Sequence, residues 1–371
     1  MTSRNAIKDE EAAVFFYAPF TRDGIERVPE TPEAYWAWIL SHPKIGEGKY
    51  TWTLQTYLFM KQAGLPCQLV TELPRRGIVI SHRDFLPSFL PPRAGVFLIC
   101  IKADRNEHSW AHFHVVQNAR DSLLARDRPA IAMDHWPQPS LIARDTARGT
   151  RCENLGYFGR ELNLAPELRT QEWSAELTAL GWTWSARDRA HWHDYHDIDV
   201  TISVRDFETH GVSNDPVLNA DSKPASKLVN SWHAGVPAIV GRESAFRRAR
   251  RSRLDFIEVE SMDDLRSALA TLRANPSLYH DMVANGLRRA AEHSPAEVAS
   301  QWKTLLTEGI AESLAAWRAQ NSFTRLANGY RRMLSYFLKP QHIMSMLTAD
   351  LTGTANRTLK PVDAPADNRI R

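Results

Sequence analysis

The sequence lacks any long hydrophobic run. The longest in its 371 residues lies between Gly95 and Ile101, far short of the ~20 residues that a membrane-spanning helix needs. The first eleven residues carry several charges, which is unlike the apolar centre of a secretory signal peptide. We therefore expect a cytoplasmic protein that stays where it is made.

Cysteine is scarce as well. Cys67, Cys100 and Cys152 are widely spaced and form no C-x-x-C pair, which excludes a disulfide framework and a cysteine zinc site. The histidines at positions 191, 193 and 196 precede a predicted strand and have no second group of ligands at a zinc-like spacing. The sequence predicts no metal and no cofactor.

An excess of charge of one sign is also missing. The chain has 46 Lys and Arg against 43 Asp and Glu, and the net charge of +3 is too small to indicate a nucleic-acid-binding protein. With 43% hydrophobic residues and no repeat of fixed period, disordered and fibrous classes are excluded. The length exceeds one ordinary core and predicts two domains with a cleft between them.

The first 145 residues alternate strand and helix patterns, and we predict an α/β domain over 1–145. Its strand-like runs are continuous rather than alternating, which is typical of parallel strands buried on both faces. These runs are 12–18, 67–71, 77–81, 96–101 and 114–117. A helix is expected over 52–63, and the proline-rich stretch 126–152 is the predicted connection between the domains.

Polar residues follow two of these runs directly. His82 and Asp84 come after one, and Lys102 and Asp104 come after the next. Ligands of open parallel sheets bind beyond the carboxyl ends of the strands, so these four are the catalytic candidates. Two plainer alternatives remain open: an ordinary turn at His82 and Asp84, and an ion pair between Lys102 and Asp104.

A second α/β pattern begins near residue 146. Strands are expected at 154–159, 197–204 and 236–240, and helices at 226–234, 263–272 and 277–286, the last ending at Gly286. We predict a second domain over 146–306 and a helical segment over 307–350 that packs back on the first domain. The tail 351–371 is expected to be disordered.

The strongest signal lies between Ser222 and Glu243. Pro224 stands two residues before a predicted helix, whose first turn offers backbone N–H groups that favour phosphate. Lys223 and Lys227 add positive charge beside that turn. The pattern indicates a diphosphate site; solvated surface lysines are the plainer alternative.

Together with 255–259 and 282–286, this stretch resembles the donor-binding half of GT-B glycosyltransferases, over about residues 153–306. The first half is similar more loosely, through Gly46 to Gly48, Tyr50 to Trp52 and His82 to Asp84. As a whole the chain is most similar to bacterial members that assemble polysaccharides. Among these it most resembles the cyanobacterial heterocyst-envelope type of UDP-glucose-dependent α-glucosyltransferase.

The resemblance implies two Rossmann-like, doubly wound domains that face a central cleft. It implies transfer of a hexose, glucose from UDP-glucose with retention, onto a saccharide or lipid-linked acceptor in exopolysaccharide or envelope synthesis, without a metal. The donor-binding candidates are Gly159, Arg160, Asp194, Tyr195, Lys223, Ser226, Lys227 and Asn230, and the cleft or acceptor candidates are Gly48, Lys49, Trp52 and Trp136. Ser222 and Asn230 replace two glutamates of many retaining members, which leaves the stereochemistry open.

Other hypotheses stay open at this point. A nucleotide-sugar hydrolase or epimerase would use the same fold, and a binding-only protein with a degenerate site would explain the missing glutamates. The arginines of 242–253 and the basic, apolar segment 330–339 suit contact with an anionic inner membrane leaflet. The plainer alternatives are a solvated face for the arginines and packing on the first domain for 330–339. Nucleic acid is disfavoured because the arginines are not regularly interleaved with aromatic residues.

Overall fold

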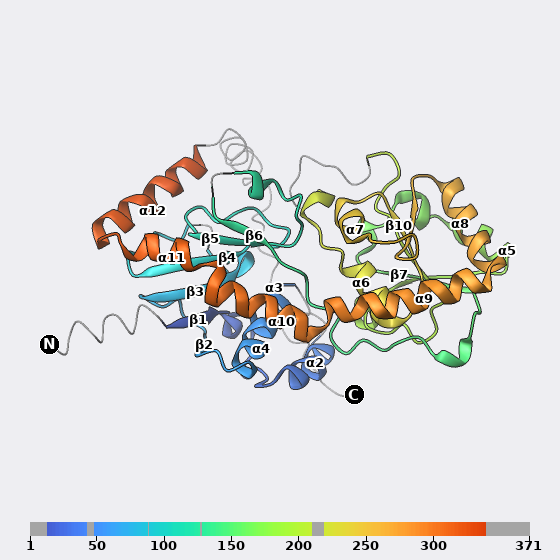
Figure 1. The fold of residues 1–371 in the computed structure, drawn as a ribbon, viewed down its shortest axis with the longest axis horizontal. Helices are drawn as coiled ribbons and strands as arrows, with labels where there is room; N and C mark the ends of the chain where they lie inside the picture. The colour runs from blue at the N-terminus through green and yellow to red at the C-terminus, as the bar shows by residue number, and fades with distance from the viewer. Residues whose placement is uncertain (1–12, 43–47, 88, 127, 210–218, 339–371) are drawn as a thin grey trace, which may run out of the picture.

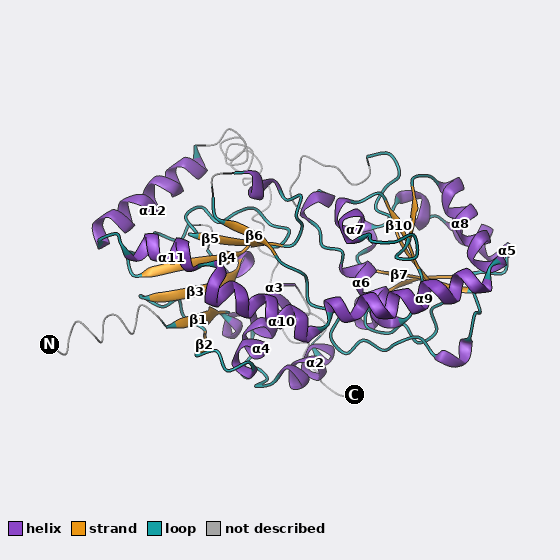
Figure 2. Cartoon of the chain, in the orientation of Figure 1, coloured by secondary structure: helices purple, strands orange, loops and turns teal. Residues whose placement is uncertain are grey.

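Two parallel sheets lie along the long axis of the molecule, in a computed structural model that describes residues 13–42, 48–87, 89–126, 128–209 and 219–338 (Figure 1). Helices surround both sheets (Figure 2). The predicted α/β class with two parallel sheets is confirmed. Gly46, the segment 339–350 and the tail 351–371 lie outside the described residues.

The first sheet has six strands among the described residues, in the order β2-β1-β3-β4-β5-β6. They are β1 (Val14–Tyr17), β2 (Cys67–Val70), β3 (Gly77–His82), β4 (Val96–Ile101), β5 (Phe113–Val116) and β6 (Ala130–Ala132). Every residue of β3, β4 and β5 is buried, which explains why their sequences do not alternate. The sequence did not predict β6, because its three residues lie in the proline-rich connection.

Helices α2 (Pro32–Ser41), α3 (Gly48–Tyr50) and α4 (Thr56–Gln62) belong to the first half. A π-helical stretch, Thr51–Gln55, joins α3 to α4. The helix predicted over 52–63 is therefore confirmed, although the helical region begins earlier, at Gly48.

The second sheet has five strands among the described residues, in the order β11-β10-β9-β7-β8. They are β7 (Asn154–Phe158), β8 (Thr183–Arg187), β9 (Val200–Ser203), β10 (Ala238–Gly241) and β11 (Ile257–Val259). The helices of this half are α5 (Gln171–Ala179), α6 (Ser226–Ala234), α7 (Ser244–Ala249), α8 (Met262–Ala274) and α9 (Pro276–Ala290). Helix α6 ends at Gly235, whose φ of 68° is left-handed, so both of its predicted ends are confirmed.

The predicted end of α9 at Gly286 is wrong, because the helix continues to Ala290. A Cβ atom at Gly286 would lie 3.0 Å from Cδ1 of Trp232 in α6. The glycine therefore permits close packing of α9 on α6 and does not stop the helix.

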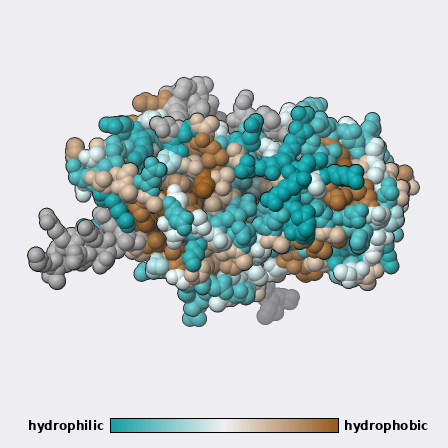
Figure 3. Space-filling view, in the orientation of Figure 1, coloured by the Kyte–Doolittle hydropathy of each residue, from teal (hydrophilic) through white to brown (hydrophobic). Residues whose placement is uncertain are grey.

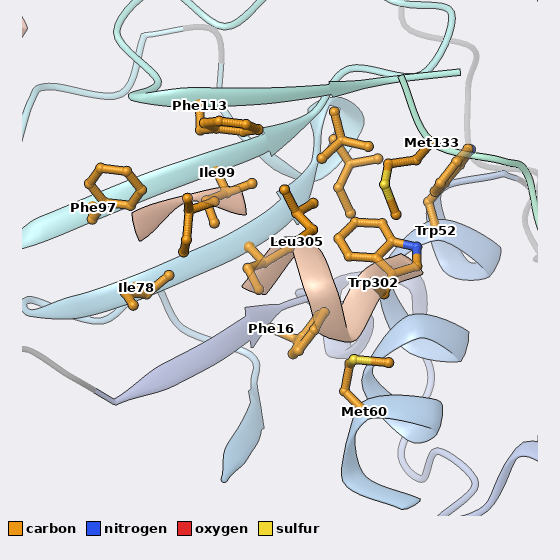
Figure 4. Close-up of a cluster of buried hydrophobic side chains, with 14 of the residues drawn as sticks. Phe16, Trp52, Met60, Ile78, Phe97, Ile99, Phe113, Met133, Trp302 and Leu305 are labelled. Carbon is orange, nitrogen blue, oxygen red and sulfur yellow. The ribbon is translucent and has the colours of Figure 1, made fainter. Parts of the chain in front are cut away.

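The chain then returns to the first sheet through α10 (Pro295–Thr304), α11 (Ala311–Arg318) and α12 (Ser322–Phe337) (Figure 1). Trp302 and Leu305 pack in one cluster with Phe16 and Ile99 of that sheet (Figure 4). The predicted limit of the second domain at residue 306 falls within this group of helices. Within the described part of the chain, no helix has both the length and the apolar composition to cross a membrane.

Three buried histidines lie close together in the sequence: His114 in β5, and His108 and His112 just before that strand. The His108 N–H donates to His114 Nε2 at 3.2 Å, and the Leu98 N–H donates to His112 Nδ1 at 3.0 Å. Burial, helped by neighbouring arginines, lowers the pKa of His108 and of His114 to about 3. These imidazoles are neutral in the folded protein at any ordinary pH.

This cluster predicts a loss of stability in acid. Below the ordinary histidine pKa of 6.5, the unfolded chain binds protons that buried His108 and His114 do not, so the free energy of unfolding falls as the pH is lowered. Each histidine contributes about 1.4 kcal/mol per pH unit. Urea unfolding between pH 7 and pH 4.5 measures the slope.

The variant His108→Phe keeps an aromatic ring at the buried site but cannot bind the proton. We expect its stability to fall less steeply in acid than that of the parent protein. His280→Phe is the matched control, because His280 is exposed, and it should leave the slope unchanged. Equal slopes for parent and His108→Phe would contradict this account.

Candidate functional site

A cleft lies between the two sheets. Nine of the predicted site residues line it: Gly48, Asp104, Trp136, Gly159, Arg160, Lys223, Ser226, Lys227 and Asn230. His135, Gln138, Phe158, Arg189, Trp192 and Arg205 also line it. The cleft therefore combines residues that follow β4 and β7 with the start of α6 and the connection near residue 136.

The first turn of α6 opens onto this cleft. Pro224, Ser226 and Lys227 line it, and the residue before the helix, Ala225, makes no side-chain capping hydrogen bond. Alanine is a poor capping residue because it has no acceptor for the first N–H groups. These donors, at the positive end of the helix dipole, remain available to an anion in the cleft.

Lys227 lies beside Gly159 at the end of β7. A Cβ atom at Gly159 would lie 2.8 Å from Cε of Lys227, so only glycine leaves room for the lysine stem. The Lys227 ammonium makes no hydrogen bond or ion pair with any described residue and lies 5.7 Å from the centre of the Tyr157 ring. Burial, with a smaller effect of Arg205, lowers the pKa of Lys227 to about 7.

Arg160 is exposed on the other side of Gly159. The Tyr157 hydroxyl donates to the Arg160 carbonyl at 2.9 Å and fixes the backbone there. The guanidinium of Arg160 has no hydrogen-bond partner within the described ranges. The prediction that Arg160 contacts a diphosphate agrees with this position but stays a prediction.

The sequence analysis missed Arg205. Its Nε donates to Glu243 at 3.0 Å, whereas one terminal nitrogen is buried without a hydrogen-bond partner in the described structure. Arg205 follows β9 by two residues, whereas Lys102 and Asp104 follow β4 by one and three, so all three lie just beyond the end of a strand. Applying the strand-end rule to 197–204 would have found it.

Asp104 and Lys223 join the two halves across the cleft. Lys223 Nζ lies 2.6 Å from Oδ2 of Asp104. Burial raises the pKa of Asp104, but the charge and hydrogen bond of Lys223 outweigh it, so the pKa is lowered overall. Burial lowers the pKa of Lys223, and Asp104 opposes that shift.

The alternative that Lys102 pairs with Asp104 is wrong. Ala103, between them, has a φ of 49°, and this left-handed residue sends the two side chains apart. Lys102 is buried and pairs with Asp121 at 2.6 Å, away from the residues that line the cleft. The strained backbone therefore supplies one cleft residue, Asp104.

Residues that follow β5 hold the loop before α6. Asn118 Nδ2 donates to the carbonyls of Ala220 and Lys223 at 3.2 and 2.9 Å, and Gln117 donates to the Ser222 carbonyl at 3.1 Å. These contacts fix Lys223 opposite Asp104. The site therefore depends on an interface between the halves as well as on its own side chains.

Asn230 is engaged by its neighbours. Its Oδ1 accepts the Gln138 N–H at 3.0 Å, and the Tyr195 hydroxyl also bonds to this side chain. Tyr195 is fully buried, and its ring stacks on Phe158 with centroids 3.7 Å apart. The predicted donor-binding residue Tyr195 therefore does not line the cleft, because its side chain is packed against Phe158.

Asp194 is also absent from the lining of the cleft. Its carboxylate accepts the His196 N–H at 3.0 Å within its own turn. No group of three or more His, Cys, Asp or Glu in the described residues could hold a metal ion. His191 bonds to Asp188 at 2.8 Å instead.

Two catalytic candidates lie away from the cleft. His82 is buried, and its Nδ1 accepts the Asp84 N–H at 3.1 Å as a cap of the following turn. Burial lowers the pKa of His82 to about 4. Asp84 pairs with Arg105 at 2.9 Å, so the geometry matches the ordinary-turn alternative.

Lys49 and Trp52 do not line the cleft either. Lys49 pairs with Asp23 at 2.8 Å, and Trp52 is buried in the cluster that contains Trp302. Both belong to the helical region that begins at Gly48, from which Gly48 and Thr51 line the cleft.

Two histidines, His135 and His193, line the cleft, and the structure shows the tautomer of His135. Its Nδ1 lies 2.6 Å from the Trp136 carbonyl, which can only accept, so the proton is on Nδ1. Burial lowers its pKa, and nearby Asp104 opposes that shift. The neutral ring therefore has an unprotonated Nε2 that can accept a hydrogen bond or a proton.

Sequence comparisons give no assignment: no family profile and no curated protein matches the chain. Among solved structures, it is similar to TarM, with 8% identity, 69% of this chain and 58% of the other covered, and a TM-score of 0.46. It is also similar to HepE of Anabaena in complex with UDP, with 10% identity, 82% of this chain and 100% of the other covered, and a TM-score of 0.43. The pneumococcal O-GlcNAc transferase GtfA is similar with 11% identity, 71% of this chain and 60% of the other covered, and a TM-score of 0.41. The chain spans less than two thirds of the length of TarM.

The ion pair across the cleft gives a stability prediction. Asp104→Asn keeps the shape of the side chain but leaves the buried Lys223 ammonium without its opposite charge. We expect it to lower the free energy of unfolding by about 1–3 kcal/mol in urea titrations. Adding Lys223→Met should restore part of that loss.

Asp263→Asn is the matched control. Asp263 pairs with Arg266 on the surface, where such a pair contributes at most about 1 kcal/mol. If Asp104→Asn is no less stable than Asp263→Asn, the two halves are not joined by this pair.

Proposed function

We propose that the chain is a glycosyltransferase that takes a sugar from a nucleoside diphosphate sugar in the cleft between the two sheets. The observation that carries the proposal is the convergence of three cations and an uncapped helix start at one place. Arg160, Arg205 and Lys227, the last of them in the first turn of α6, line the same cleft. A diphosphate suits that arrangement because it accepts several hydrogen bonds and carries negative charge.

The donor half of the reaction follows from these groups. Transfer breaks the bond between the anomeric carbon and the diphosphate oxygen, and negative charge develops on that oxygen. Guanidinium and ammonium groups, together with the N–H groups of α6, would stabilise it without a metal. Two of the three cations, Arg160 and Lys227, have no hydrogen-bond or ion-pair partner among the described residues and are available to do so.

The acceptor half requires a group that takes a proton from a sugar hydroxyl. We assign this role to Nε2 of His135, a residue that lines the cleft near Asp104 and whose Nε2 is unprotonated. General-base catalysis by a neutral imidazole is suited to neutral pH. The acceptor, a saccharide or a lipid-linked saccharide, would enter from the first half.

The finer proposals come from the sequence resemblance. They are UDP-glucose as the donor, transfer of the hexose with retention, and a place in exopolysaccharide or envelope synthesis. Retention is the least supported of these, because the Ser222 hydroxyl donates to the Asn219 carbonyl at 2.8 Å and Asn230 is engaged by Gln138.

Those two engaged side chains favour a second candidate, a nucleotide-sugar-binding protein without turnover. The two proposals differ in one measurement. A transferase releases UDP only when an acceptor is present, a hydrolase releases it in water alone, and a binding protein releases none.

Calorimetric titration with UDP-glucose tests the donor site. We expect Lys227→Met and Arg160→Met each to weaken binding by about tenfold to a hundredfold, because each removes a charged hydrogen bond to phosphate. Lys61→Met, which removes an exposed lysine of α4, is the matched control and should bind normally. Unchanged binding in Lys227→Met would contradict the site.

Lys227 also predicts a pH dependence of binding. The diphosphate favours the charged ammonium of Lys227. Because the pKa of this ammonium is about 7 in the free protein, Lys227 is increasingly neutral above pH 7 and must take up a proton when the ligand binds. The affinity for UDP-glucose should therefore fall above pH 7, by up to tenfold per pH unit. Lys227→Met should show a flat profile, and a flat profile in the parent protein would contradict this role.

A further inference from the structure

Helix α12 carries several large apolar residues on the outside of the molecule. Phe323, Leu334 and the following Leu338 are 80%, 58% and 70% exposed, and Tyr330 is exposed as well. With Ala327, they recur at helical spacing and form one stripe along the helix, which is about 24 Å long at 1.5 Å per residue. We call these five residues the outer stripe.

The opposite face of α12 is the one that packs on the protein, and it contains Arg325, Gly329, Met333 and Tyr336. Arg325 is buried and donates to the carbonyls of Trp317 and Arg318 at 3.0 and 3.1 Å. A Cβ atom at Gly329 would lie 2.5 Å from Cβ of Pro92. A surface helix of a soluble protein normally has a polar outer face. Because α12 already packs on the protein through this other face, that packing does not account for the exposed outer stripe.

A neighbouring aromatic pair extends the apolar surface. Phe89 is exposed and stacks on Phe337 with ring centroids 5.0 Å apart. Figure 1 shows α12 at the end of the molecule remote from the second sheet. The patch therefore lies away from the cleft.

The charge around the outer stripe has one sign. Residues 313–338 contain four arginines and no Asp or Glu, and Arg331 is exposed beside the stripe. An apolar helix face with cations and no acids matches the interface of an anionic bilayer. A second copy of this chain would bring the same arginines into contact, which disfavours self-association.

We propose that α12 docks flat on an anionic lipid surface through the outer stripe, and that Arg331 contacts lipid headgroups. This surface is independent of the proposed transferase activity. It also differs from the other basic segment, 242–253, whose Arg242, Arg247 and Arg251 pair with glutamates. That segment belongs to a broad hydrophilic face over α7 and α9 (Figure 3).

Sedimentation with vesicles tests the proposal. The full-length protein should bind vesicles of phosphatidylcholine with one third phosphatidylglycerol at least tenfold more tightly than vesicles of phosphatidylcholine alone, and salt should weaken the binding. The triple variant Phe323→Ser, Leu334→Ser, Leu338→Ser should lose at least tenfold in binding to the anionic vesicles.

The matched control replaces three exposed leucines elsewhere, Leu162→Ser, Leu180→Ser and Leu287→Ser, and should bind like the parent protein. Circular dichroism and thermal unfolding verify that both triple variants fold. Equal loss in both variants, or no preference for anionic vesicles, would overturn the proposal. A dimer that the outer-stripe variant abolishes, without vesicle binding by the parent, would overturn it in favour of a second copy.

Discussion

The ion pair between Asp104 and Lys223 is the contact on which the cleft depends. It joins the end of β4 in the first sheet to the loop before α6 in the second half. Asn118 and Gln117 bind the same loop through its carbonyl groups. Because the loop leads directly into α6, these contacts also set where the start of that helix points.

The electrostatic character of the cleft follows from that placement. Acidic groups in the cleft are neutralised within the protein: Asp104 pairs with Lys223, and Glu243, next to the cleft, pairs with Arg205. Lys227 and Arg160 have no such partner in the described residues, and the first turn of α6 has no side-chain cap. The groups without a partner are hydrogen-bond donors and cations, so the cleft favours an anion. The lowered pKa of Lys227 reflects the free-energy cost of holding its positive charge in a buried place.

The sequence predicted the backbone better than the side-chain roles. Continuous apolar runs identified β3 and β4, and the Ser226 start and Gly235 end of α6 agree with the structure. The strand-end rule selected residues but could not tell which way their side chains point. Ala103 turns Lys102 away from the cleft and Asp104 into it, and His82 caps a turn.

Two further errors come from tertiary contacts. The burial of Tyr195 could not be predicted from the sequence because it depends on stacking against Phe158 of β7. Gly286 was mistaken for a helix stop since only the tertiary contact with Trp232 explains it.

A crystal structure of the protein with UDP-glucose tests the central claim most directly. The account predicts that the diphosphate lies at the first turn of α6, within hydrogen-bond distance of the Ser226 and Lys227 N–H groups and beside Arg160. Density for the diphosphate elsewhere, such as in the neighbouring cavity lined by Arg248 and His293, would contradict it.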